Sequence, residues 1–388
     1  MPGRLRKTFL LMPGAGTLPR FLALYGALFL AFGVSSPFLA AFLSEKGMSS
    51  EAIGLALAAG TAIRIVSGPA GGRAADVLRA PRAVLVALAG CAAVVACLYI
   101  PANGAFPLVL VSVIHAAALA PLVPLADALT LAAIRTDHVR YGWVRGGGSA
   151  AFILGTVVAG SVVAIQGLTS IIWLNAGLMG IAACCATAVP DRISNPDPRA
   201  APAGGLRALF GMATYRRIIL AAALIQGSHA LHDGFAVINW TQAGIGSATA
   251  GALWSLSVAA EVLVFLLLGR VLIDRLTPAG ACALSAVAGI LRWGLLAHSA
   301  SVWAIAVAEP LHGLTFALQH LVSVRLIAAS VPAHLAATAQ AVYGTVAIGS
   351  AYATLMLASG WLYAQFGAHG FWVMAGLCAA ALPFAARL

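Results

Sequence analysis

Long apolar segments alternate with short polar breaks along almost the whole chain. A helix that crosses a lipid bilayer needs about 20 apolar residues. Segments of roughly this length predict helices over residues 20–43, 51–74, 82–101, 105–133, 141–166, 168–188, 216–241, 248–270, 278–298, 302–326, 335–364 and 367–386. Because the breaks are too short for a soluble domain, the pattern predicts an all-α membrane protein with twelve transmembrane helices.

One break is longer than the others and is rich in Pro, Gly and Ala, with the sequence PDRISNPDPRAAPAGG. Such a composition is typical of a linker. Because six predicted helices lie on either side of it, we expect two six-helix bundles. The expected parts are a cytoplasmic N-terminus at 1–19, an N-terminal bundle at 20–188, a cytoplasmic linker at 189–215 and a C-terminal bundle at 216–388.

Composition and charge agree with a membrane environment. Of the 388 residues, 62% are hydrophobic and 9% are charged, whereas soluble domains are about 25% charged. The mean hydropathy is +0.98. Most of the Lys and Arg residues behind the net charge of +11 lie at the termini or in alternate breaks. The positive-inside rule therefore places both termini in the cytoplasm. We expect a multi-pass protein of a bacterial cytoplasmic (inner) membrane, and no binding of nucleic acid.

Residue patterns typical of catalysis or metal binding are missing from the sequence. All six cysteines lie in apolar segments, without a CxxC motif or a histidine at metal-binding spacing, and we expect them to be small buried residues. There is no glycine-rich phosphate loop, zinc signature or serine nucleophile elbow. We therefore expect neither an enzyme nor a metal site.

Seven charged residues lie inside the apolar segments. A charge at the centre of a bilayer costs from about 2.5 to more than 10 kcal/mol unless it is paired or reaches water. Such residues commonly mark the path of a polar solute. The seven residues are Arg64, Asp127, Arg145, Asp233, Glu261, Arg292 and Glu309.

A short motif recurs at matching places in the two halves, at the predicted cytoplasmic turns after the second and the eighth helices. Glycine allows two helices to approach closely, and the aspartate can cap a helix or pair with an arginine. The repeat therefore predicts a conformational gate. Its residues are Gly72, Asp76 and Arg79 in the first half and Gly269, Asp274 and Arg275 in the second.

With this repeat, the chain resembles the major facilitator superfamily, whose members carry a Gly-x-x-x-Asp-x-x-Arg type motif after the second helix. Residues 141–152, YGWVRGGGSAAF, resemble the start of the fifth helix in the lactose permease and phenylpropionate permease group. Residues 227–235, GSHALHDGF, the segment 254–261 and Arg292-Trp293 resemble the phenylpropionate branch. The resemblance implies two bundles around a central cavity and transport by alternating access.

Asp127 and Arg145 lie on adjacent predicted helices joined by a short loop, which can bring the two side chains together. The pair resembles the sugar-binding acid and arginine of the lactose permease, where the acid accepts hydroxyl hydrogen bonds and the arginine donates. The alternative is a structural salt bridge between helices. Both interpretations remain open at this point.

Arg64 and Glu261 hold equivalent places in the repeat, because each precedes the motif glycine, Gly72 or Gly269, by eight residues. We therefore predict that they lie at equal depth and face one cavity from opposite bundles. The alternative is that each is paired within its own bundle.

Glu309 and His312 are three residues apart, so they share a helix face, and Arg292 lies on the preceding predicted helix. In the lactose permease the corresponding glutamate follows the histidine by one turn, whereas Glu309 precedes His312. This departure leaves open whether Glu309 or another acid carries the proton.

His229, His232 and Asp233 share a face of the seventh predicted helix. Imidazole suits proton exchange because its unperturbed pKa is about 6.5. Phe235 and other aromatic residues are expected to shape a substrate pocket, although most membrane aromatics pack or anchor at the interface.

The apolar segments hold four acids but three arginines, so one acid lacks an arginine partner. Burial favours the protonated form of such an acid, and a group that takes up a proton when dry and releases it when wet can couple transport to protons. We predict a proton symporter with no other cofactor. The candidates for proton coupling are Glu309 in first place and then Asp233, Glu261, His312 and His232.

The substrate-binding candidates are Asp127, Arg145, Arg292, Arg64, His229 and Phe235. The phenylpropionate branch implies an aromatic or other organic carboxylate held by Arg64 or Arg292. The acid–arginine pair and the charge count instead favour a neutral sugar or nucleoside, and a receptor or scaffold without transport is a remote alternative. We expect a monomer whose partners are its substrate, protons and the bilayer.

Overall fold

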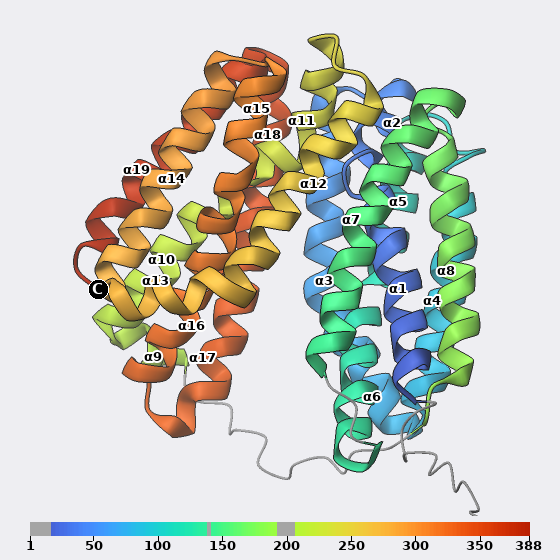
Figure 1. The fold of residues 1–388 in the computed structure, drawn as a ribbon, viewed down its shortest axis with the longest axis horizontal. Helices are drawn as coiled ribbons and strands as arrows, with labels where there is room; N and C mark the ends of the chain where they lie inside the picture. The colour runs from blue at the N-terminus through green and yellow to red at the C-terminus, as the bar shows by residue number, and fades with distance from the viewer. Residues whose placement is uncertain (1–16, 138–140, 192–205) are drawn as a thin grey trace, which may run out of the picture.

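The computed structural model describes residues 17–137, 141–191 and 206–388, and every regular element in these ranges is a helix. Helices of the first half of the chain form one group and those of the second half form another (Figure 1). The predicted N-terminal segment at 1–19 and the predicted linker at 189–215 lie largely outside the described residues.

The first group contains α1 to α8, and the second contains α9 to α19 with six short 3-10 or π-helical segments, η1 to η6. In the first group the helices are α1 (Thr17–Ser35), α2 (Leu39–Glu45), α3 (Ser50–Leu78), α4 (Pro81–Cys97), α5 (Ala105–Leu119), α6 (Leu122–Asp137), α7 (Tyr141–Gln166) and α8 (Ser170–Ala188). In the second group they are α9 (Leu206–Gly211), α10 (Ala213–Gly227), α11 (Ala230–Gln242), α12 (Ser247–Leu263), η1 (Val264–Leu268), α13 (Gly269–Arg275), α14 (Pro278–His298), α15 (Val302–Ala308), η2 (Glu309–Leu311), η3 (Gly313–Leu318), α16 (Gln319–Ser330), η4 (Ala333–Leu335), α17 (Ala336–Val342), η5 (Tyr343–Ser350), α18 (Ala351–Phe366), η6 (Gly367–Gly370) and α19 (Phe371–Ala385).

Nine helical stretches in the described part of the chain are long and apolar enough to cross a membrane. The last stretch, Thr338–Ala385, covers two of the predicted helices, and Pro81–Cys97 is a shorter apolar helix. An all-α membrane fold is therefore confirmed. The number of twelve crossings and the cytoplasmic position of both termini stay predictions.

The predicted helix 216–241 is broken into α10 and α11 by a turn at Ser228 and His229. Gly227 ends α10 beside α18, and a Cβ on it would lie 2.5 Å from Leu355 Cδ1, so glycine permits this close approach. The sequence pattern missed the break because the segments on both sides of the turn are apolar and read as one continuous span.

The recurring motif lies within helices rather than in turns, so that part of the expectation was wrong. Arg73, Ala74 and Ala75 after Gly72 are good helix formers, and α3 continues to Leu78 before Arg79 ends it in the left-handed conformation, with φ 49°. In the second half Gly269 begins α13. Asp274, in α13, lies 2.9 Å from Arg325 Nη1. The role of the motif as a gate stays a prediction.

The two groups touch at the end of the molecule that carries α2 and α11, and their helices diverge toward the end that carries α6, α9 and α17 (Figure 1). Glycines allow the contact. A Cβ on Gly54 of α3 would lie 2.8 Å from Gly360 Cα of α18, and one on Gly160 of α7 would lie 3.2 Å from Gly251 Cα of α12. Among the described residues, two buried apolar clusters, a large one and a small one, span both groups, while two others lie each within one group. The space between the diverging helices contains the site.

Candidate functional site

A cavity of about 740 Å³ lies between the two groups of helices. Arg64 of α3 and Glu261 of α12 both line it, from opposite sides, as their matching places in the repeat predicted. The titratable side chains around it are Arg64, Tyr99 and His115 from the first half and His229, His232, Asp233, Glu261, His312 and Tyr352 from the second.

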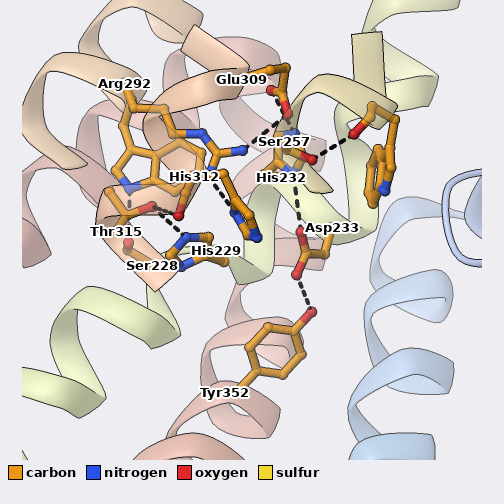
Figure 2. A network of polar contacts seen from close by, with 12 residues as sticks. Ser228, His229, His232, Asp233, Ser257, Arg292, Glu309, His312, Thr315 and Tyr352 are labelled. Atoms are coloured by element: carbon orange, nitrogen blue, oxygen red, sulfur yellow. Dashed lines mark hydrogen bonds and ion pairs between the residues drawn. The ribbon is translucent and has the colours of Figure 1, made fainter. Parts of the chain in front are cut away.

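Glu309 lies behind the cavity wall with its side chain fully buried, and its two oxygens have different partners (Figure 2). Arg292 Nη2 donates to Oε2 at 3.2 Å, and His232 Nε2 lies 3.0 Å from Oε1. Pro310 cannot donate a backbone hydrogen bond, and the helix changes to the 3-10 turn η2 at Glu309. Because Arg292 is equally buried, each charge offsets the desolvation of the other.

His232 joins Glu309 to the cavity. Its Nδ1 lies 3.0 Å from Asp233 Oδ1, and Tyr352 donates to Asp233 Oδ2 at 2.8 Å. The Asp233 side chain is 32% exposed, whereas those of His232 and Glu309 are 2% and 0% exposed. Of the two triad members that line the cavity, Asp233 is therefore the more exposed one.

The triad needs one more proton than a neutral histidine and two carboxylates can supply. Each ring nitrogen of His232 faces a carboxylate oxygen, and an ionised carboxylate only accepts hydrogen bonds. A neutral imidazole has one N–H, so the second contact requires either an imidazolium or a protonated acid. The triad of Asp233, His232 and Glu309 therefore holds an exchangeable proton.

His312 connects Arg292 to Glu261. Arg292 Nη1 lies 3.0 Å from His312 Nδ1, and since a guanidinium only donates, Nδ1 accepts. The proton of a neutral His312 then lies on Nε2, which is 3.4 Å from Glu261 Oε2. A continuous polar chain thus runs from Asp233 through Glu309 and Arg292 to Glu261.

Aromatic rings hold this chain in place. Trp254 stacks on His232, with ring centroids 4.9 Å apart. Trp293 lies under the Arg292 guanidinium at 4.4 Å, and its Nε1 donates to Ser228 Oγ at 2.8 Å. Ser228 belongs to the turn between α10 and α11, so the helix break positions the partner of Trp293.

His229 is the second residue of that turn, and it lines the cavity with its side chain largely buried. Its Nδ1 lies 2.9 Å from the Gln226 carbonyl oxygen and must donate to it, so Nε2, 2.9 Å from Thr315 Oγ1, accepts from that hydroxyl. Both ring nitrogens are therefore occupied. This arrangement favours a structural role for His229.

Arg64 differs from the other charged residues of the apolar segments in its surroundings. Its side chain is exposed and lines the central cavity. Within the described ranges no carboxylate forms an ion pair with it, although all four acids of the apolar segments have one with a histidine or an arginine. The charge left over is thus an arginine, whereas the sequence count predicted an acid, because histidines serve as partners of the acids.

The sequence model of the MFS_1 like family matches residues 20–374. The chain belongs to this family. It is 32% identical over 368 residues to the probable 3-phenylpropionic acid transporter of Escherichia coli K12, covering 92% of this chain and 94% of the relative. It is also 24% identical over 355 residues to the maltose permease of Geobacillus stearothermophilus, covering 91% and 90%. The predicted membership of the major facilitator superfamily is confirmed, and this protein is a membrane transporter and not an enzyme.

Solved transporters share the fold of this MFS_1 like protein. The nucleoside transporter NupG superposes with a TM-score of 0.84 at 16% identity, covering 95% of this chain and 98% of NupG. A bacterial homolog of the human lysosomal transporter Spinster, in an inward-facing and occupied conformation, gives a TM-score of 0.73 at 14% identity, covering 95% of each chain. At such identities these structures support the fold alone.

Asp127 and Arg145 of this transporter lie close together but away from the central cavity. Tyr25 donates a hydrogen bond to Asp127 Oδ1, Arg145 Nη1 lies 4.0 Å from the same oxygen, and the Arg145 guanidinium lies 5.2 Å from the Phe29 ring centroid. Neither residue of the pair is among those that line the central cavity. Of the two interpretations left open by the sequence, this placement favours a structural salt bridge.

Two further candidates also lie off the cavity wall. Phe235 is buried and stacks on Tyr363, with ring centroids 4.7 Å apart, because it lies on another face of α11 than Asp233, two residues earlier. Arg292 is enclosed by Glu309 and His312. Sequence reasoning also missed Tyr352, since nothing local marks it as the partner of an aspartate more than a hundred residues away.

Proposed function

We propose that this transporter carries a small organic carboxylate together with a proton by alternating access. The observation that carries the proposal is Arg64, a charged side chain on the wall of the central cavity without a carboxylate partner in the described ranges. A guanidinium binds a carboxylate in a bidentate geometry. Of the two arginines that the sequence suggested as its partner, Arg292 is already occupied by Glu309.

A relative with a related substrate supports this choice. The probable 3-phenylpropionic acid transporter of E. coli is similar over nearly the whole chain, and its substrate bears a carboxylate. The sugar or nucleoside alternative rested on Asp127 and Arg145, which lie away from the cavity, and on the count of one unpaired acid, whereas all four acids of the apolar segments have a histidine or arginine partner. We therefore favour an acid, in a monomeric transporter of a bacterial inner membrane.

The triad of Asp233, His232 and Glu309 supplies the proton site in this proposal. Water in the cavity reaches Asp233, and His232 passes the proton between Asp233 and the buried Glu309. With Arg292 included, an imidazolium makes this group neutral, and loss of the proton leaves one uncompensated negative charge. Since a buried uncompensated charge is costly, we expect the proton to leave only when the cavity is wet.

The polar chain offers a link between substrate and proton. Glu261 faces the cavity opposite Arg64, and His312 and Arg292 connect it to Glu309. A change of charge in the cavity therefore changes the electrostatic field at the proton site. This link supports symport, in which acid and proton move together.

Binding of 3-phenylpropionate to purified protein tests the proposal. Loss of a charge-assisted hydrogen-bonded contact costs about 1.5–3 kcal/mol, so Arg64→Gln should raise the Kd roughly tenfold or more. The control is Arg207→Gln, because Arg207 is exposed on α9 away from the cavity lining. Equal Kd values for the wild type and Arg64→Gln would reject Arg64 as the carboxylate site. Tighter binding of maltose or a nucleoside would reject the substrate class.

A further inference from the structure

A second cavity of about 730 Å³ is lined by residues of the first group of helices and adjoins the central cavity, with which it shares Phe32, Ser36, Arg64, Pro69, Leu119 and Phe152. Its walls come from α1, α3, α7 and the junction of α5 and α6. We call it the tail chamber. Its lining residues are Phe29, Phe32, Ser36, Arg64, Gly68, Pro69, Gly72, Leu119, Ala120, Val123, Pro124 and Phe152.

The two cavities differ in chemistry. Among the described residues that line the tail chamber, only Arg64 and Ser36 have polar side chains, and three of the others are phenylalanines. The central cavity also has apolar walls, but many hydroxyl, imidazole and carboxylate groups interrupt them, including those of Asp233, Glu261 and His312. An apolar ring placed over these groups would deprive them of hydrogen bonds, which costs free energy. The tail chamber offers apolar surface without that cost.

Among the six described residues that line both cavities, Arg64 is the charged one, so its guanidinium lies where the tail chamber adjoins the central cavity. We propose that the substrate binds across this boundary, with its carboxylate on Arg64 and its apolar, preferably aromatic, tail in the tail chamber. The substrate class is then an acid with an aryl group on a short chain. This inference rests on the proposed function, because it requires a carboxylate at Arg64.

Gly68 provides a way to fill the tail chamber without disturbing the fold. It lines the chamber, and a Cβ built on it meets no atom within 4 Å. Leucine also favours a helix more than glycine does, so Gly68→Leu should fold normally. Gly344 gives a matched control, because it lines the central cavity, is not part of the tail chamber and has the same free space around its Cβ position.

The test measures binding of 3-phenylpropionate and of propionate, which lacks the ring, by competition with purified protein. Burial of an aromatic ring predicts that the wild type binds 3-phenylpropionate roughly 10- to 100-fold more tightly than propionate. We expect Gly68→Leu to remove most of this advantage and to leave the Kd of propionate within about twofold. Gly344→Leu should retain the advantage.

Each of four results would overturn the inference. If Gly344→Leu removes the advantage of the ring and Gly68→Leu keeps it, the ring lies in the central cavity. Equal Kd values of the two acids for the wild type would show that no apolar site takes the tail. Both results leave the carboxylate site at Arg64 intact. If the wild type binds neither acid, or if Arg64→Gln binds both as the wild type does, the proposed function fails and the inference fails with it.

Discussion

Replacement of Gly160 and Gly251 with alanine should hold the two groups of helices apart where they now touch. A Cβ on Gly160 would lie 2.6 Å from the Ser247 carbonyl oxygen, and one on Gly251 would lie 2.7 Å from the Thr156 carbonyl oxygen. Ordinary contact begins near 3.4 Å, so α7 and α12 must separate by about 0.8 Å. Overpacking of this kind costs about 1–3 kcal/mol, which shifts a two-state equilibrium roughly 5- to 150-fold.

The shift would be measured as access of a labelling reagent to the central cavity from the side on which the two groups of helices now touch. A cysteine at Thr61, on the cavity wall, would be labelled with a membrane-impermeant maleimide in a background without the native cysteines. We expect labelling from the outer side to be at least about fivefold faster in the double alanine variant. Gly146→Ala on the same helix is the control, because its Cβ position is free of neighbours. Unchanged labelling in the double variant would refute the idea that these glycines close the cavity.

Three further substitutions test separate parts of the site. Glu309→Gln leaves the Arg292 guanidinium buried without its carboxylate, so the free energy of unfolding should fall by about 3–5 kcal/mol; an unchanged Tm in detergent would contradict the buried pair. Asp233→Asn removes the cavity-facing acid of the triad, so proteoliposomes should lose accumulation driven by a pH gradient but keep substrate exchange; retained accumulation would exclude Asp233. Asp127→Asn should lower the free energy of unfolding by about 1–3 kcal/mol and leave the substrate Kd within about twofold, whereas a large loss of affinity would restore its role in binding.

The sequence predicted the helical membrane fold because apolar segments of bilayer length leave few alternatives. It missed the break between α10 and α11, because the turn at Ser228 and His229 depends on the approach of α18 to Gly227. The helix propensities of the residues around the turn do not depend on that contact, so they could not predict the break.

The sequence also identified the charged residues of the site, because a charged residue is unusual in an apolar segment. Their partners were not fully predictable. His232 meets Glu309 from a helix far away in the sequence, and the placement of Asp127 outside the cavity depends on the rotation and depth of α6. Such details are set by packing between helices, which the spacing of charges does not encode.

The most direct test follows protons and substrate in one experiment. Proteoliposomes that contain a pH indicator and no imposed gradient receive labelled 3-phenylpropionate at a pH where passive entry of the acid is slow. We expect uptake and acidification of the lumen to begin together in the wild type and in Arg207→Gln, and both to be lost in Arg64→Gln. Uptake by the wild type without a change of lumenal pH, or uptake that survives Arg64→Gln unchanged, would contradict proton symport of a carboxylate held by Arg64.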